Sequence, residues 1–154
     1  MGKLLVVVDM QKDFIDGALG TKEAVAIVPQ VVSKIKEFLQ AGDKIIFTKD
    51  THFENYMETQ EGKNLPVMHC IKGTEGHEIC EEIKAIINPE EYTIYEKLTF
   101  GSSEFAQDLK NGVYDDAESI TLIGLCTDIC VISNAMLCKT FLTEIPVFIA
   151  ADCC

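Results

Sequence analysis

Tryptophan is absent from this chain of 154 residues, histidine occurs only three times, and no apolar stretch is long. A membrane-spanning helix needs about 20 consecutive apolar residues, so the sequence predicts no membrane span. The apolar run Leu4–Val8 follows the first three residues directly and ends at Asp9. This arrangement is unlike a secretory signal, and we therefore expect a cytoplasmic protein.

Basic residues are also scarce. The chain has 13 Lys and Arg against 25 Asp and Glu, which gives a formal net charge of −12. A strongly negative surface repels phosphate backbones and anionic lipids. Nucleic acids and membranes are therefore not expected as partners.

The seven cysteines show no disulfide framework, because their number is odd and their spacing irregular. We expect reduced thiols. Cys126 and Cys130 form a C-x3-C pattern, but no second cysteine pair or nearby histidine completes a zinc site. Cys80 and Cys138 are interpreted as small core residues.

Apolar runs alternate with helical patterns along the whole chain, as in α/β proteins. This alternation predicts a single domain over residues 1–154 with a three-layer α/β/α fold, a mostly parallel sheet and helices on both faces. A long, polar, irregular segment spans residues 49–76, and loops of this length are usually functional. Strands are expected at residues 4–8, 44–48, 93–95, 120–125 and 147–150, and helices from about Pro29 to Gly42 and at 77–87, 103–109 and 128–142.

Chemically active side chains follow the expected strands. Asp9, Asp50, Lys97 and Cys130 all lie at or just after strand ends, where ligands bind in such sheets. Cys130 is expected in the first turn of a helix, near unpaired N–H groups and the positive end of the helix dipole. Such a position favours the thiolate, so Cys130 is a candidate nucleophile.

Three segments around these residues, in the same order along the chain, resemble the isochorismatase-like cysteine hydrolases. They are VVVDMQKDF at Val6–Phe14, EKLTFGSSEF at Glu96–Phe105 and GLCTDICV at Gly124–Val131. The resemblance covers essentially the whole chain and implies a catalytic triad of Asp9, Lys97 and Cys130.

The chemistry of a cysteine hydrolase also requires these residue types, independently of the resemblance. A thiol needs a base or a positive neighbour to become a nucleophile. Asp9 is suited to accept the thiol proton and Lys97 to stabilise the thiolate. The N–H groups of Cys126 and Cys130 face the same turn, as in an oxyanion hole. The resemblance further implies a cis peptide bond before Cys126.

The middle segment indicates which members of the family are most similar. Asp50 and His52 form a D-x-H pattern, and His69 follows in PVMHCIKGT. This is similar to the metal site of nicotinamidases, also called pyrazinamidases, and implies one divalent ion, typically zinc, with iron or manganese as alternatives. Glu61 is favoured as the fourth ligand, with Glu58 as the alternative.

Two further positions follow from this resemblance, together with two differences. Phe14 matches a position whose ring packs against the substrate, and His77, outside the motif, is expected at the surface. The aromatic residue that many nicotinamidases place near Leu65 and Pro66 is missing. The resemblance also implies that the chain lacks the final helix, and often a last strand, that the family has after the Asp-Cys-Cys segment at residues 152–154.

The sequence therefore predicts a metal-binding amidohydrolase that converts nicotinamide to nicotinate and ammonia through a thioester on Cys130. One alternative is a related hydrolase of another small amide, such as a carbamoyl or ureido compound. Another is a non-catalytic binding protein on the same scaffold. Isochorismate hydrolysis is disfavoured because it needs no nucleophilic cysteine. We expect a small-molecule amide as the partner and a homo-oligomer as the assembly.

Overall fold

A computed structural model describes residues 2–154 and contains a five-stranded parallel sheet in the order β3-β2-β1-β4-β5. The predicted strands are all present, and every pairing is parallel. The α/β fold class is thereby confirmed. The strands are β1 (Leu4–Val8), β2 (Lys44–Asp50), β3 (Thr93–Lys97), β4 (Ile120–Gly124) and β5 (Val147–Ile149).

The central strand β1 sets the register of the sheet. Val8 pairs with Thr48 of β2 on one side and with Gly124 of β4 on the other. On the next strand, Asp50 pairs with Lys97 of β3. Because parallel strands end at the same edge, the residues that follow them meet there.

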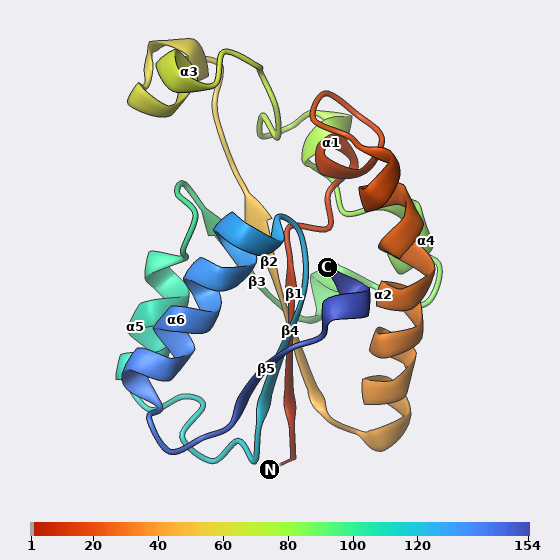
Figure 1. The fold of residues 1–154 in the computed structure, drawn as a ribbon, viewed down its shortest axis with the longest axis vertical. Helices are drawn as coiled ribbons and strands as arrows, with labels where there is room; N and C mark the ends of the chain where they lie inside the picture. Colours follow the sequence, from red (N-terminus) through yellow and green to blue (C-terminus); the bar gives the residue numbers. More distant parts are fainter. Residues whose placement is uncertain (1) are drawn as a thin grey trace.

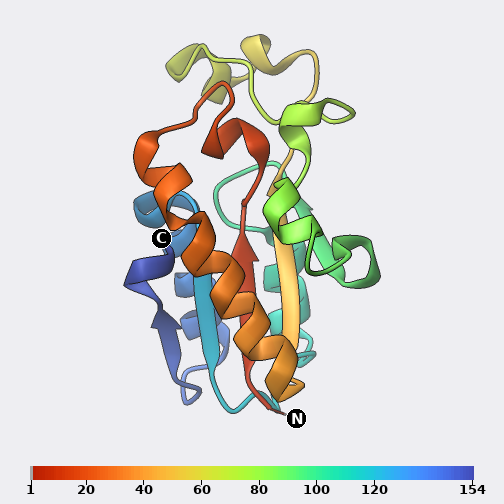
Figure 2. The same cartoon turned by 90° about the vertical axis from the view of Figure 1, so that its right-hand side faces the viewer.

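Helices cover both faces of the sheet, so three layers form (Figures 1 and 2). On one face, α2 (Lys22–Ala41) and α4 (Glu81–Lys84) bury apolar side chains against the odd-numbered residues of β1 and β2. On the other face, α5 (Ser103–Lys110) and α6 (Ile132–Phe141) pack against the even-numbered residues of these strands. The alternation along β1 and β2 thus assigns their buried apolar side chains to two core clusters, one on each face.

The helix α2 begins earlier than the sequence predicts. Thr21 caps it by accepting a hydrogen bond from the N–H of Ala24 at 3.0 Å, and Pro29 lies inside the helix. Proline there removes one backbone hydrogen bond. Burial of the flanking Val28 and Val31 against the sheet compensates for that loss. The end at Gly42 is confirmed, with a left-handed φ of 73° that glycine adopts without strain.

The predicted helix at residues 77–87 is wrong at both ends. Only Glu81–Lys84 is α-helical, preceded by a 3-10 turn at Glu75–His77. The reason is tertiary pairing: Lys12 N–H donates to the Glu78 carbonyl at 3.0 Å, and Cys80 N–H to the Met10 carbonyl at 3.0 Å. These bonds hold residues 78–80 extended beside the loop after β1.

His77 is not a surface residue, contrary to the sequence-based expectation. Its side chain is buried, with Nε2 2.9 Å from the Thr51 hydroxyl, and its carbonyl accepts a hydrogen bond from Gln11 at 2.9 Å. Through these contacts, His77 stabilises the loop that follows β2.

The segment between β2 and α4 extends beyond the carboxyl edge of the sheet (Figure 1). It contains a 3-10 turn at Tyr56–Glu58 and the short helix α3 (Gln60–Asn64). Along residues 2–154, no helix has the length and apolar character that crossing a membrane requires.

Candidate active site

Asp9 follows β1 and is completely buried. Its φ of 50° lies in the left-handed region, which Asp tolerates better than most residues. Thr48 of β2 holds it, because the Thr48 hydroxyl donates to Asp9 Oδ1 at 2.7 Å. The second oxygen, Oδ2, forms an ion pair with the Lys97 ammonium at 2.7 Å.

Lys97 ends β3 and links the other groups. Its Nζ lies 2.7 Å from Asp9 Oδ2, 3.3 Å from Cys130 Sγ and 3.6 Å from Asp50 Oδ1. It also donates to the Thr99 carbonyl at 3.1 Å. The structure thus brings the three predicted triad residues together in a buried cluster.

Cys130 lies in a π-helical turn, Thr127–Val131, that directly precedes α6. Before the turn, Gly124 adopts a φ of 116°, and a side chain there would collide with the Val8 carbonyl. The peptide bond between Leu125 and Cys126 is cis, as the resemblance implies. Asn134 fixes the turn by donating to the Cys130 carbonyl at 2.8 Å.

The electrostatics around Cys130 correct one expectation. Burial, followed by the charge of Asp9, raises the pKa of the Cys130 thiol above its ordinary value, although Lys97 opposes the rise. The helix start alone therefore does not produce a resting thiolate. Burial also raises the pKa of Asp9 despite the opposing charge of Lys97. A raised carboxyl pKa suits a base that exchanges a proton near neutral pH.

The predicted metal ligands also converge. One ligand atom from each of Asp50, His52, Glu61 and His69 lies within 4.8 Å of the others. Asp50 Oδ2 is 3.0 Å from His52 Nε2 and 3.4 Å from His69 Nε2. Glu61 Oε1 is 3.8 Å from His52 Nε2. Glu58, the alternative ligand, is exposed and is not part of this group.

The donor set fits a divalent transition ion. Ligand atoms about 2.1 Å from a tetrahedral metal are about 3.4 Å apart, and the observed separations bracket that value. The Nδ1 of His69 bonds to the Val67 carbonyl at 2.7 Å, which leaves Nε2 free as a ligand. Burial would raise the pKa of Asp50, but hydrogen bonds from His52 and His69 outweigh it and lower that pKa. Asp50 is therefore ionised, as a ligand must be.

Aromatic rings surround the two histidines. Tyr56 is fully buried, and its ring contacts His52 and His69 edge-on at centroid distances of 4.7 and 5.0 Å. Its hydroxyl donates to the Leu65 carbonyl at 2.9 Å. The ring of Phe14 lies 5.5 Å from that of His69, so the proposed substrate residue borders the metal cluster.

Gln11 and Asp13 brace the loops around the cluster. Gln11 Oε1 accepts from the N–H of Asp50 at 2.8 Å, and its Nε2 donates to the Asp50 carbonyl at 2.8 Å. Asp13 accepts from the Cys70 N–H at 2.8 Å, directly after His69. Sequence reasoning did not assign these roles, or those of Thr48, Tyr56 and Asn134. Gln11 and Asp13 lie in the same sequence motif as Asp9. That position was the one sequence feature that could have indicated their roles.

A cavity of about 490 Å³ opens beside the metal-ligand candidate Glu61. It borders the ligand Glu61 on one side and Ile129, next to Cys130, on the other. Its walls are mainly apolar, with Leu65 near the position where an aromatic residue is missing. The lining residues are Gln60, Glu61, Asn64, Leu65, Thr99, Phe100 and Ile129.

Known proteins resemble this chain over nearly its whole length. A Bacillus subtilis protein described as an uncharacterized isochorismatase family protein, PncA, is 30% identical over 143 residues, which cover 88% of this chain and 78% of that protein. The crystal structure of Pyrococcus horikoshii pyrazinamidase in complex with zinc is 28% identical with a TM-score of 0.78, covering 98% of this chain and 84% of that one.

Two further structures extend the comparison. The nicotinamidase/pyrazinamidase PncA of Bacillus subtilis is 28% identical with a TM-score of 0.82, covering 99% and 86% of the two chains. The N-carbamoylsarcosine amidase of Thermoplasma acidophilum is 25% identical with a TM-score of 0.77, covering 99% and 83%. The model of the isochorismatase domain matches residues 3–154, and the chain therefore belongs to the isochorismatase family of hydrolases.

Proposed function

We propose that this hydrolase is a metal-binding cysteine amidohydrolase that converts nicotinamide to nicotinate and ammonia. The observation that carries the proposal is that Asp50, a member of the metal cluster, also contacts the lysine of the triad. Its Oδ1 lies 3.6 Å from Lys97 Nζ, and its Oδ2 lies 3.0 Å from His52 Nε2. A small ring held at the metal cluster thus lies beside the nucleophile.

Cys130 and Asp9 carry the chemical steps of this proposal. The sulfur forms a bond to the carboxamide carbon while the thiol proton passes to Asp9. Asp9 then returns the proton to the leaving nitrogen, so that ammonia departs and a thioester remains. Water attacks the thioester, gives a proton to the same carboxylate and releases nicotinate, and the thiol is restored.

Lys97 and two backbone N–H groups stabilise the charges in this sequence. Lys97 contacts both the sulfur and the carboxylate, so it balances the thiolate and lowers the cost of moving the proton. The Cys126 N–H donates no hydrogen bond to any atom of residues 2–154. With the N–H of Cys130, it is available for the oxygen that gains negative charge.

Asp50, His52, Glu61 and His69 would hold the divalent ion, for which zinc is favoured. The Pyrococcus horikoshii pyrazinamidase was solved with zinc. When bound, the ion would supply a Lewis-acid site for the pyridine nitrogen. Phe14 and Tyr56 pack around the histidines and orient them. Leu65 and Phe100 give the cavity an apolar wall for the ring.

A second candidate function has one observation in its favour. The N-carbamoylsarcosine amidase resembles this chain almost as well in fold as the pyrazinamidase does, with TM-scores of 0.77 and 0.78. Hydrolysis of a carbamoyl compound would use the same triad. It has no need of the four converging ligands, and for this reason we favour the nicotinamide reaction.

The test is ammonia release from nicotinamide, pyrazinamide, N-carbamoylsarcosine and acetamide, each with and without prior removal of metal by a chelator. We expect turnover of the two ring amides, lost with the metal and restored by zinc. Asp9→Asn should nearly abolish it, because an amide cannot accept the thiol proton. Turnover of N-carbamoylsarcosine alone, insensitive to chelation, would establish the second candidate instead.

A further inference from the structure

Asn134 is a fully buried residue in the first turn of α6, and both ends of its side-chain amide have hydrogen-bond partners. Its Oδ1 accepts from the N–H of Ser102 at 3.0 Å. Its Nδ2 donates to the carbonyl of Phe100 at 3.3 Å and to that of Cys130 at 2.8 Å. These partners fix the orientation of the amide, because exchanging its oxygen and nitrogen would set an acceptor against two carbonyls.

The three partners of Asn134 lie in two segments that are far apart in the sequence. One segment is the turn that carries Cys130, directly before α6. The other is the loop of residues 98–102, which connects β3 to α5. We call it the Lys97 loop, because Lys97 directly precedes it. The side chain of Asn134 therefore ties the Lys97 loop to the turn of the nucleophile.

Few other contacts hold the Lys97 loop against α6. Within residues 2–154, no other side chain from outside residues 97–105 forms a hydrogen bond with the backbone of this loop. The loop lies close to the helix, since a Cβ at Gly101 would come within 3.1 Å of a methyl carbon of Leu137. The hydrogen bonds of Asn134 maintain this close approach.

The Lys97 loop also helps to place the Lys97 ammonium. Its Nζ donates to the Thr99 carbonyl of the loop at 3.1 Å and lies 3.3 Å from Cys130 Sγ. We propose that Asn134 is a positioning residue, which keeps the Lys97 ammonium in contact with the Cys130 thiol by tying the loop to the turn. Without this tie the loop can move away from α6, and the thiol reacts more slowly because less positive charge supports its thiolate.

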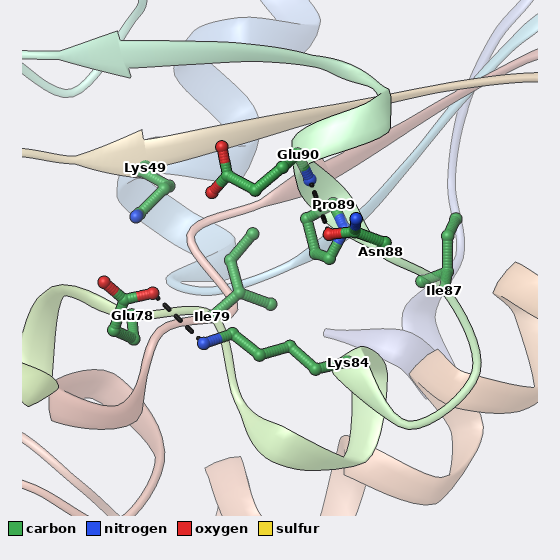
Figure 3. Close-up of a pocket in the computed structure, with 8 residues that line it drawn as sticks. All are labelled: Lys49, Glu78, Ile79, Lys84, Ile87, Asn88, Pro89 and Glu90. Atoms are coloured by element: carbon green, nitrogen blue, oxygen red, sulfur yellow. Dashed lines mark hydrogen bonds and ion pairs between the residues drawn. The ribbon is translucent and has the colours of Figure 1, made fainter.

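Asn88 provides a contrast within the same chain. It is exposed, and its side-chain oxygen accepts from the N–H of Glu90, two residues later, at 3.2 Å (Figure 3). This bond caps the 3-10 turn Pro89–Glu91 and joins no second segment. Asn88→Ala is therefore the matched control, because it removes the same amide from a local contact.

The inference rests on Cys130 as the nucleophile of the proposed function, but not on which amide is hydrolysed. Its first readout is the rate at which iodoacetamide alkylates Cys130 in the metal-loaded full chain at one fixed pH, measured by mass spectrometry. Asn134→Ala should slow alkylation by about fivefold, and in a Lys97→Ala background by less than about twofold, because no ammonium is left to position. Asn88→Ala should match its parent in both backgrounds.

Asn134→Ser separates the two halves of the tie and serves if Asn134→Ala does not fold. A serine four residues after Cys130 can still donate to the Cys130 carbonyl within the helix, but it is too short to reach the Lys97 loop. We therefore expect Asn134→Ser to be as slow as Asn134→Ala. Circular dichroism checks that each variant is folded.

Steady-state kinetics with the amide that the ammonia assay identifies give the second readout. In both Asn134 variants kcat should fall by about fivefold while KM changes by less than about twofold, because the ammonium acts on the thiol. Wild-type alkylation in Asn134→Ser, an equal loss in the Lys97→Ala background, or a rise in KM alone would overturn the proposal. Absence of nicotinamide turnover would reject the proposed function and leave the alkylation test in force.

Discussion

The triad and the metal cluster lie side by side but are positioned by different parts of the chain. Asp9 and Lys97 lie at strand ends with fully buried side chains, 2.7 Å apart. In the metal cluster only Asp50 belongs to a strand, while His52, Glu61 and His69 lie on the segment beyond it. The Glu61 side chain remains 26% exposed. The sheet therefore defines the triad, and a loop defines the cluster.

The two clusters also differ in charge. The triad has its own cation, because the Lys97 ammonium contacts Asp9 and the thiol. The metal cluster brings the carboxylates of Asp50 and Glu61 together with two imidazoles. Of these groups, the Lys97 ammonium reaches only Asp50 Oδ1, at 3.6 Å. Converging ligands of this kind are stabilised by a bound cation. We therefore expect the triad to persist without metal, whereas the cluster depends on it.

The largest effect should come from the nucleophile. Cys130→Ala should reduce amide hydrolysis by at least about a thousandfold, because no thioester can form. Since the metal ligands lie elsewhere, bound metal measured by elemental analysis should be unchanged. Cys138→Ala removes a buried thiol of α6 from the same core cluster; it is the matched control and should retain activity. Turnover of Cys130→Ala within tenfold of wild type would exclude the triad.

Loss of metal should show most directly that the triad and the metal cluster act independently. His52→Ala and His69→Ala should each lose the ion and hydrolyse nicotinamide at least about a hundredfold more slowly. Alkylation of Cys130 by iodoacetamide, read by mass spectrometry, should continue at a rate close to that of wild type. If the metal-free variants lose alkylation as well, the triad is not independent of the cluster.

A smaller effect is expected from the cation of the triad. Lys97 lowers the pKa of Cys130, while burial and Asp9 raise it. In Lys97→Ala the thiolate faces the Asp9 carboxylate without a counter-ion, so the thiol pKa should rise further. The alkylation profile should move to higher pH by one unit or more, about tenfold in rate at a given pH below the inflection. Lys139→Ala on α6 should leave the profile in place.

The sequence predicts most of the sheet and the triad for a common physical reason. Buried parallel strands are continuous apolar runs, so Leu4–Val8 and Ile120–Gly124 are recognisable without tertiary information. The residues that follow such strands must meet at one edge. Asp9 and Cys130 were therefore accessible from local patterns alone.

The errors arise where distant segments decide the outcome. The helix expected from His77 fails because residues 78–80 pair with the loop after β1. His77 is buried and contacts Thr51, which is 26 residues away in the sequence. The residues next to His77 in the sequence give no sign of this contact. The raised pKa of Cys130 depends on its burial and then on the charge of Asp9, which lies far away in the sequence. Burial and long-range pairing are properties of the packed molecule and leave little trace in local sequence.

The smallest effect concerns the fourth metal ligand. Glu61 Oε1 lies 3.8 Å from His52 Nε2, whereas Glu58 is exposed outside the cluster. Glu61→Ala should weaken zinc affinity by about tenfold, since a partly exposed ligand can be replaced in part by water. Glu58→Ala, a loss of equal charge on the same loop, should change it less than about twofold. Competition with a chromophoric zinc chelator measures both. A larger effect from Glu58→Ala would transfer the ligand role to Glu58 and require the loop to rearrange when the ion binds.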